Sequence, residues 1–438
     1  MRLLAPPMED AIAAETDIFG RDRFIDGLLR LFESTDEPLV VVLDEKWGTG
    51  KTVFAKRLER SATEQGFPAI YFDAFSSDYN SDVFISLASA VMAKLPTKQK
   101  RERFQSRVVN VAKAVGKVAA KSSVRVLTVG LLNTADLEKA SEEIAKEVSS
   151  VVEGEFDKAI EERLNRSNQD RIAFDEFRNT LSTVGENFPG AKQGKPLIFI
   201  VDELDRCKPP YALALIETMK HFFSVSSVKF LLVCQVDQIL SSIRHTYGTD
   251  IDAQRYLEKF VHTYVYFPIA EGHTRKAQML AFVSEIVSGM PSDGEDGSLS
   301  GEMVNFITDL AIRKNYSLRN IERVLTQFAI CMAFTKKGQL RLGAVLFVLC
   351  DLKYNNTNLF QKAKRGELNY HQLNSFYSFD AENEHWYISW LEYFFEPQIN
   401  LNDPKWKDQN RYLSRYSISN PKKTALYFAN NVVDCITV

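Results

Sequence analysis

The sequence has few of the side chains that build metal centres or disulfide frameworks. Its 438 residues include five cysteines and six histidines. No two cysteines stand at C-x-x-C spacing and no histidine cluster accompanies them, which argues against a zinc site and against a disulfide-stapled fold. Apart from Cys435, the cysteines lie in or beside apolar runs. We expect these four to be small buried side chains in a reducing compartment: Cys207, Cys234, Cys331 and Cys350.

The sequence also lacks a long hydrophobic run. None of its apolar stretches approaches the ~18 residues that can span a bilayer. The best candidates, residues 39–43, 126–132 and 344–350, have the size of core elements. Residues 1–17 show no charged and then apolar pattern of a secretory signal. We therefore expect a cytoplasmic protein without integral membrane association.

Neither sign of charge is in strong excess. The formal net charge is −3, so the chain as a whole is not suited to a nucleic-acid polyanion, and such binding would need a local basic patch. The hydrophobic share of 45% and the charged share of 25% are typical of globular domains. The length predicts two or three of them.

What the sequence does contain is a series of short, unbroken apolar runs separated by helical patterns. The runs predict buried parallel strands at residues 39–43, 69–72, 197–201 and 230–234. Amphipathic spacing predicts helices over residues 21–32 and 53–64. Strands that alternate with helices indicate an α/β fold with a parallel, helix-covered sheet.

A glycine-rich turn joins the first strand to its helix. Glycines let phosphate oxygens approach the backbone, and the N–H groups that open the helix point at them. Lys51 would contact the β- and γ-phosphates of ATP, and the Thr52 hydroxyl would ligate Mg²⁺. The full pattern G-x-x-x-x-G-K-[ST] has glycine where this chain has Glu45. This motif alone is therefore also consistent with a glycine-rich turn that enters a helix and binds no phosphate. The predicted nucleotide contacts here are Trp47, Gly48, Thr49, Gly50, Lys51, Thr52 and Val53.

A second signal follows the third strand, where Asp202 and Glu203 end a buried run. We expect Asp202 to hold the magnesium shell and Glu203 to orient and activate the attacking water. Unpartnered carboxylates are costly at a buried strand end. A purely structural role for this pair is therefore the weaker alternative once the Lys51 loop is considered.

Two polar positions near these strand ends leave alternatives open. Arg206 either reaches a phosphate in a neighbouring subunit or pairs internally with Asp205. Gln235, after the fourth strand, either senses the γ-phosphate or positions water. The alternative for that strand end is a helix N-terminus capped by Asp237.

Residues 80–185 form a long interruption of helical composition. Its part 94–125 is basic, and its part 136–162 has an excess of acidic residues. A helical hairpin with opposed charges accounts for both. A membrane-surface or nucleic-acid role is the alternative. The basic side chains are Lys98, Lys100, Arg101, Arg103, Arg107, Lys113, Lys117 and Lys121.

These patterns divide the chain into four parts. Residues 1–79 together with 186–270 form a parallel-sheet P-loop NTPase core, and residues 80–185 form a helical insertion within it. Residues 271–367 have the pattern of a helical lid domain. Residues 368–438 are rich in aromatic side chains and carry no motif, so their role stays unknown.

The motifs resemble the KAP family of P-loop NTPases. Residues 47–52 are similar to its W-G-S-G-K-[ST] loop, and residues 202–207, which read D-E-L-D-R-C, resemble its more specific D-D-L-D-R-C signature. Shorter segments resemble three further motifs of the family. Phe72–Phe75 resembles its F-N-A-W, and Tyr256–Lys259 with Phe267-Pro268 resembles its Y-L-E-K and the following strand that ends in Pro. Ser317–Asn320 resembles its N-x-R motif.

The resemblance covers about residues 17–365 and implies ATP binding and hydrolysis, a parallel sheet with a helical lid, and a sensor role for Arg319. Many members carry transmembrane hairpins between the two main motifs, whereas the insertion here lacks such spans. Two departures stand out. Glu45 replaces the first loop glycine. Glu203 replaces an aspartate and so matches the catalytic glutamate of related ATPases.

Three functional interpretations follow. The first is a magnesium-dependent ATPase with Glu203, Lys51, Arg206 and Arg319 as its catalytic residues. Its nucleotide cycle would change its conformation or its assembly, as a homo-oligomer or with a protein partner, and the resemblance implies bacterial members in anti-phage defence. The second is a nucleotide-gated interaction module with little hydrolysis. The third is an ATPase that engages nucleic acid through the basic stretch 98–125.

Overall fold

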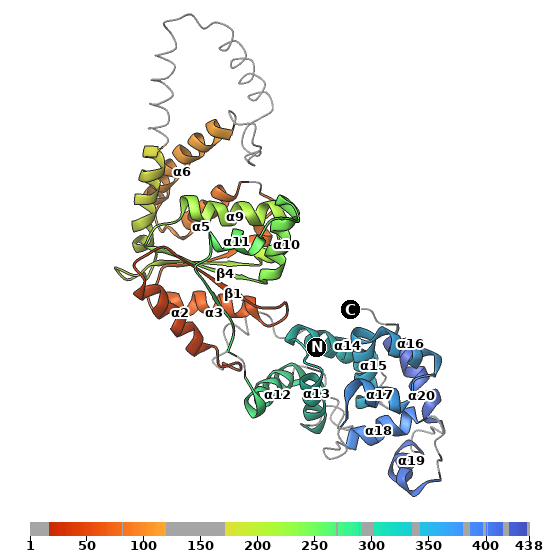
Figure 1. The fold of residues 1–438 in the computed structure, drawn as a ribbon. Helices are drawn as coiled ribbons and strands as arrows, with labels where there is room; N and C mark the ends of the chain where they lie inside the picture. The colour runs from red at the N-terminus through yellow and green to blue at the C-terminus, as the bar shows by residue number, and fades with distance from the viewer. Residues whose placement is uncertain are drawn as a thin grey trace, which may run out of the picture. The chain divides into compact units, whose positions relative to one another are not determined.

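The protein divides into two compact units (Figure 1). The sheet unit comprises Arg21–Lys46 and Lys51–Pro268, and the helical unit comprises Met1–Gly20, Trp47–Gly50 and Ile269–Val438. Within these bounds the computed structural model describes residues 17–80, 82–119, 171–268, 270–288, 290, 301–334, 342–379, 386–396, 400, 402–414 and 420–435. None of the helices described there combines the length and apolarity needed to cross a membrane.

A parallel sheet forms the centre of the sheet unit, with strand order β2-β3-β4-β1-β5. The strands are β1 Leu39–Asp44, β2 Ala69–Asp73, β3 Leu197–Asp202, β4 Val228–Cys234 and β5 Thr263–Val265. The α/β fold and the four strands predicted from apolar runs are confirmed. The short β5 gives no such run, because its three side chains are only half buried.

Helices cover both faces of this sheet, which explains why its strands are apolar without alternation. Successive strand residues point to opposite faces. Val41 and Val233 therefore pack in the core beneath α2 and α3. Val42 and Leu232 pack in the core on the other side. The helices of this unit are α2 Asp22–Ser34, α3 Lys51–Glu64, α4 Ala74–Ser77, α5 Val83–Lys94, α6 Lys98–Ala119, α9 Pro209–Phe222, α10 Val236–Tyr247 and α11 Ala253–Glu258, with 3-10 turns η1 Gly185–Asn187 and η2 Leu204–Arg206.

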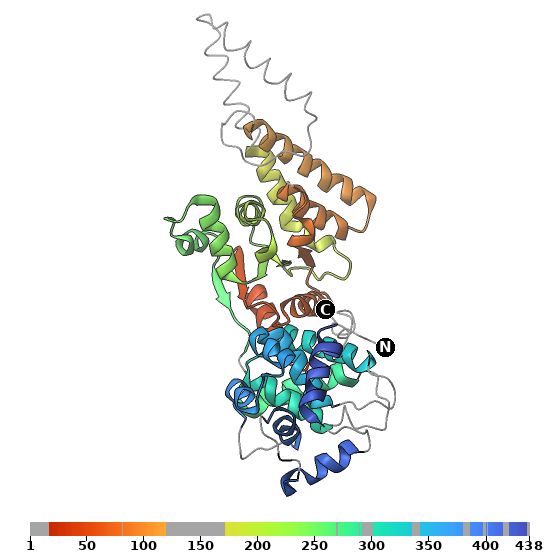
Figure 2. The ribbon, with the colours of Figure 1, turned by 90° about the vertical axis from the view of Figure 1, so that its right-hand side faces the viewer.

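The described part of the insertion contains α5, α6 and a helix over residues 171–184, and the last two form a pair (Figures 1 and 2). The rings of Phe104 and Phe177 lie 5.9 Å apart, and Arg107 forms an ion pair with Glu176. Two further basic side chains also have partners inside this unit: Lys98 lies 3.8 Å from Glu102, and Arg101 donates to the carbonyl oxygen of Leu95. The acidic stretch 136–162 and the residue Lys121 lie outside the described residues, as does the side chain of Lys117.

The helical unit is built around α15, whose residues Gly343 to Leu352 are all buried. One cluster of buried side chains extends from Met279 to Val433 and includes the tryptophans Trp390 and Trp406. Cys331 and Cys350 are buried here, as Cys207 and Cys234 are in the sheet unit. The helices are α12 Gly272–Ser288, α13 Gly301–Arg313, α14 Leu318–Phe334, α15 Gly343–Asn355, α16 Thr357–Arg365, α17 Tyr370–Tyr377, α18 Trp386–Phe395, α19 Lys407–Ser414 and α20 Pro421–Tyr427, with η3 Pro404–Trp406 and η4 Phe428–Val433.

Candidate functional site

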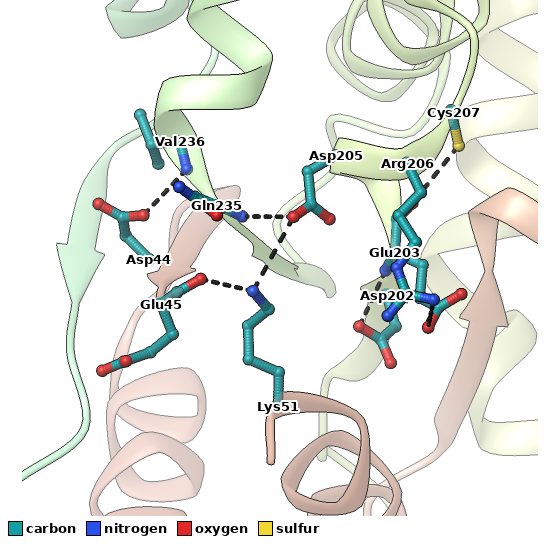
Figure 3. Close-up of polar contacts among 10 residues, drawn as sticks. All are labelled: Asp44, Glu45, Lys51, Asp202, Glu203, Asp205, Arg206, Cys207, Gln235 and Val236. Carbon is teal, nitrogen blue, oxygen red and sulfur yellow. Dashed lines mark hydrogen bonds and ion pairs between the residues drawn. The ribbon is translucent and has the colours of Figure 1, made fainter. Parts of the chain in front are cut away.

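The predicted phosphate and metal residues of the sheet unit lie at the carboxyl edge of the sheet, where ligands of open α/β sheets bind. Strand pairing aligns the ends of the strands: Asp44 pairs with Cys234, and Asp73 pairs with Asp202. β4 lies between β1 and β3, and Gln235 at the end of β4 lies near Asp44, with a hydrogen bond to Asp205 (Figure 3).

Lys51 is the first residue of α3 and only 9% exposed. Its ammonium group turns back and donates to the carbonyl oxygen of Glu45 at 2.5 Å, and it lies 3.9 Å from Asp205 (Figure 3). Burial lowers the pKa of Lys51, and the negative charge of Asp205 opposes this effect. A buried lysine beside a carboxylate stays suited to contact an anion, because a phosphate can replace the carbonyl as acceptor.

The two glycines of the loop are required by backbone geometry. Gly48 and Gly50 both have φ of +84°, a region that side chains with a Cβ rarely adopt. A Cβ at Gly48 would also stand 2.8 Å from Cβ of Arg319 and from Oγ of Ser317. Trp47 beside them is 49% exposed, whereas Thr49, Thr52 and Val53 are half buried.

Glu45 shows how the loop accommodates a residue other than glycine at its first position. Its φ is not among the positive values of the described residues, so a side chain causes no backbone strain there. Its Oε1 accepts a hydrogen bond from the N–H of Phe267 at 2.8 Å. The carboxylate is therefore held toward the chain that leaves β5, and it is satisfied there.

Asp202 and Thr52 supply the oxygen ligands that Mg²⁺ prefers. Asp202 is 1% exposed, and its carboxylate accepts hydrogen bonds from the Thr52 hydroxyl, from the Tyr71 hydroxyl at 3.0 Å and from the N–H of Glu203 at 2.8 Å. Burial raises the pKa of Asp202, and the Thr52 and Tyr71 hydrogen bonds oppose the shift. The Thr52 hydroxyl and the Asp202 carboxylate are therefore neighbours, which is the arrangement that two ligands of one ion need.

Magnesium typically uses one or two protein carboxylates and completes its shell with water and substrate phosphates. This fits a site with Asp202 and Thr52. Among the residues that the structure describes, there is no group of three or more His, Cys, Asp or Glu side chains that could hold a metal ion.

Glu203 leaves the strand in a left-handed conformation, with φ of 59° and ψ of 25°. Its carboxylate lies 2.9 Å from Nη1 of Arg206. Burial raises the pKa of Glu203, and the Arg206 guanidinium opposes this shift. The sequence predicts Asp205 as the internal partner of Arg206, whereas the structure pairs Arg206 with Glu203. The left-handed turn that brings these two side chains together leaves no pattern in the sequence.

Asp205 and Asp44 bond to the start of α10. Asp205 accepts a hydrogen bond from the N–H of Gln235 at 3.0 Å, and Asp44 accepts one from the N–H of Val236 at 2.9 Å (Figure 3). The cap of α10 thus comes from a neighbouring strand end, while Asp237 lies within the first turn of the helix. These contacts depend on the order of the strands, which the apolar runs do not encode.

Arg319 lies in the first turn of α14 and is exposed. Within the helical unit its N–H donates to the carbonyl oxygen of Gly48 at 3.3 Å. The side chain of Ser317, two residues earlier, accepts a hydrogen bond from the N–H of Asn320. The segment that resembles the N-x-R motif therefore contacts the tip of the glycine-rich loop.

Comparison with known proteins identifies one family. The model described as "KAP family P-loop domain" matches residues 21–334. A search of curated proteins gives no match.

Three solved structures resemble the chain at low sequence identity. The ORC2 protein of Aeropyrum pernix, in ADPNP-ADP complexes, is 13% identical, with 97% of each chain covered and a TM-score of 0.36. PCH-2 of C. elegans is 10% identical, with 76% of this chain and 66% of that chain covered and a TM-score of 0.29. A DNA replication initiation factor is 11% identical, with 95% of this chain and 93% of that chain covered and a TM-score of 0.31. Similarity at this level carries no information on function.

Proposed function

The chain belongs to the KAP family of P-loop NTPases, and from that premise we propose that it is a magnesium-dependent ATPase. The observation that carries the proposal is the convergence of three groups at one sheet edge. These are the Lys51 ammonium, the hydrogen-bonded pair Thr52 and Asp202, and the Glu203 carboxylate.

Each group has one role in the proposed reaction. Lys51 leaves the Glu45 carbonyl and contacts the β- and γ-phosphates of ATP. Thr52 and Asp202 would hold Mg²⁺, which would supply positive charge that offsets the negative charge of the phosphates. Glu203 orients a water molecule and takes its proton as the water oxygen attacks the γ-phosphorus. The bond between that phosphorus and the bridging oxygen breaks, giving ADP and phosphate.

Two arginines are proposed to stabilise the charge that develops on the phosphates. Arg206 lies next to the Glu203 carboxylate, and Arg319 contacts the loop tip through its main chain. Arginine is suited to stabilise phosphate charge because its planar donors match phosphate oxygens.

Gln235, at the end of β4, is proposed to contact the γ-phosphate or the attacking water.

One observation favours a second candidate, a nucleotide-gated interaction module with slow hydrolysis. The carboxylate that should orient water is engaged by Arg206 in this structure. While that ion pair persists, the Glu203 carboxylate is less available to take a proton from water. A partner or a second copy of the chain that draws Arg206 away would then start turnover.

Phosphate release separates the two candidates. We expect the wild type to release phosphate with Mg²⁺ and ATP, Lys51→Ala to lose ATP binding, and Glu203→Gln to keep ATP while losing turnover by about 10²–10⁴-fold. If the wild type releases no more phosphate than Lys51→Ala but binds ATP, the module is the correct interpretation. A role in anti-phage defence rests on the family resemblance alone, and phage plating with wild type against Lys51→Ala tests it.

A further inference from the structure

Glu45 makes three hydrogen bonds at the start of the glycine-rich loop, each to a different segment. Its N–H donates to the carbonyl oxygen of Cys234 at the end of β4, at 3.1 Å. Its own carbonyl oxygen accepts the 2.5 Å bond from Lys51, and its Oε1 accepts the 2.8 Å bond from the N–H of Phe267. One residue therefore joins β4, the loop lysine and the chain that leaves β5.

Phe267 contacts both flanks of the loop. Its N–H bonds to Glu45 before the loop. Its ring, in a side chain that is 8% exposed, packs edge-on against Phe54 of α3 with centroids 5.0 Å apart, one helical turn after Lys51. The Arg21 guanidinium lies 3.6 Å from the centroid of the same ring. Pro268, which follows, is the last residue of the sheet unit.

We propose that Glu45 is a positioning residue that links the occupancy of the phosphate loop to the chain leaving β5. The inference rests on the proposed ATP binding. A phosphate oxygen is a stronger acceptor for an ammonium group than a carbonyl oxygen, so ATP draws Lys51 away and the Glu45 main chain loses its donor. The Glu45 side chain then carries the rearrangement to the amide of Phe267. A glycine, which the general P-loop pattern has here, makes no such connection.

Amide hydrogen exchange of the peptide that contains Phe267, followed by mass spectrometry, tests this link. Without nucleotide we expect Glu45→Ala to exchange at Phe267 about tenfold faster than the wild type, because a hydrogen bond to a charged group is lost. In the wild type, Mg²⁺ with ATP should change this exchange. In Glu45→Ala the change should disappear while the Kd for ATP stays within about threefold, and Glu45→Gln should restore part of it.

Glu64→Gln serves as the matched control, because Glu64 is an exposed residue at the end of α3 that pairs with Arg60. It should respond to ATP as the wild type does. The inference is overturned if Phe267 responds to ATP equally in Glu45→Ala and the wild type, or if the wild type binds labelled ATP without any response at Phe267. A wild type that binds no labelled ATP overturns the proposed function as well.

Discussion

Carboxylates at the sheet edge fall into two groups that the sequence does not distinguish. Asp44, Glu45 and Asp205 each accept a main-chain N–H from another segment. These bonds satisfy amides beyond the strand ends, where the ladder of the sheet no longer does so. Asp202 accepts a hydrogen bond from the Tyr71 hydroxyl besides the one from the N–H of the next residue, and the Glu203 carboxylate pairs with the Arg206 side chain, so neither is committed to an amide of another segment. Because hydroxyls and a side-chain cation can be exchanged for ligands, the second pair is the one suited to chemistry.

The ion pair of Glu203 with Arg206 predicts a pH dependence of hydrolysis. Burial raises the pKa of Glu203 and Arg206 opposes the rise. Since the ionised carboxylate is needed to take a proton, activity should fall as pH falls through this pKa. Arg206→Ala removes the opposing charge, so the acid limb of the kcat/KM profile should move to higher pH, whereas Arg206→Lys should move it less. An unchanged acid limb in Arg206→Ala would show that this pair does not set the titration.

Gly48 gives a prediction at the scale of one methyl group. Gly48→Ala adds a Cβ 2.8 Å from atoms of Arg319 and Ser317 and forces φ of +84° on an alanine. We expect a loss of about 1–3 kcal/mol in unfolding free energy and at least a tenfold weaker Kd for ATP, measured by urea titration and direct binding.

Gly27→Ala is the matched control for this change, because a Cβ there meets nothing within 4 Å and the residue lies inside α2. It should be neutral or stabilising by about 0.5–1 kcal/mol. Equal effects of the two substitutions would contradict the steric account of Gly48.

At the scale of elements, local patterns predict what local forces determine. The strands β1 to β4 are readable because burial on both faces leaves unbroken apolar runs, and α2 is readable because its buried Ile25, Leu28 and Leu29 follow helical spacing. The Lys51 loop and the Asp202-Glu203 pair are readable because glycines and carboxylates are conspicuous beside such strands. Their roles as a site stay a prediction.

The contacts that the sequence hides depend on strand order and on turns. Tyr71 bonds to Asp202 only because β2 pairs with β3. The partner of Arg206 follows from the left-handed conformation of Glu203, which costs a non-glycine residue about 1–2 kcal/mol. Neither is expressed in apolar periodicity, so no spacing rule could find them.

A buried polar network joins the elements of the helical unit. Asp351 of α15 is fully buried and accepts hydrogen bonds from Tyr316 at 2.9 Å, from Tyr377 at 2.5 Å and from Asn355 at 2.8 Å. Asn355 also exchanges two amide hydrogen bonds with Asn320. Tyr316 and Asn320 flank the segment Ser317–Arg319, so the network fixes the start of α14 to α15 and α17.

Asp351→Ala should lower the unfolding free energy by about 3 kcal/mol, because the buried Tyr377 hydroxyl and the partly buried Tyr316 hydroxyl lose their acceptor. Burial raises the pKa of Asp351 in the folded state. Folding therefore favours the protonated form of Asp351. The stability that this protonation contributes is present at low pH and is lost as pH rises through the pKa of the folded state. Asp351→Asn does not titrate, so its stability relative to the wild type should increase as pH rises over that range.

Urea unfolding at a series of pH values measures both effects. Asp408→Ala, an exposed change in α19, should stay within about 1 kcal/mol of the wild type. A pH-independent difference between Asp351→Asn and the wild type would contradict the assignment of this titration to Asp351.

At the scale of the whole molecule, the sheet unit presents aromatic side chains near its proposed catalytic edge. Phe75 is 48% and Tyr79 is 84% exposed in the segment that follows β2. In the same segment Asp78 accepts a hydrogen bond from the N–H of Lys208, two residues after Arg206. Exposed aromatic side chains beside a polar rim are typical of protein interaction surfaces. We therefore expect the nucleotide cycle to control association through this segment.

The mass in solution, measured by light scattering with and without Mg²⁺ and ATP, tests this expectation. The Glu203→Gln variant should hold ATP. With ATP, its mass in solution is expected to rise from the 49.8 kDa of one chain to at least about twice that value, because ATP that binds the associated form stabilises it by mass action. Lys51→Ala should stay at one chain. Adding Phe75→Ser and Tyr79→Ser to Glu203→Gln should abolish the rise without loss of ATP, whereas Val109→Ser, at a 40% exposed position on α6, should not. If Glu203→Gln with bound ATP keeps the mass of one chain, the cycle acts within the chain and Arg206 has no phosphate of a second copy to reach.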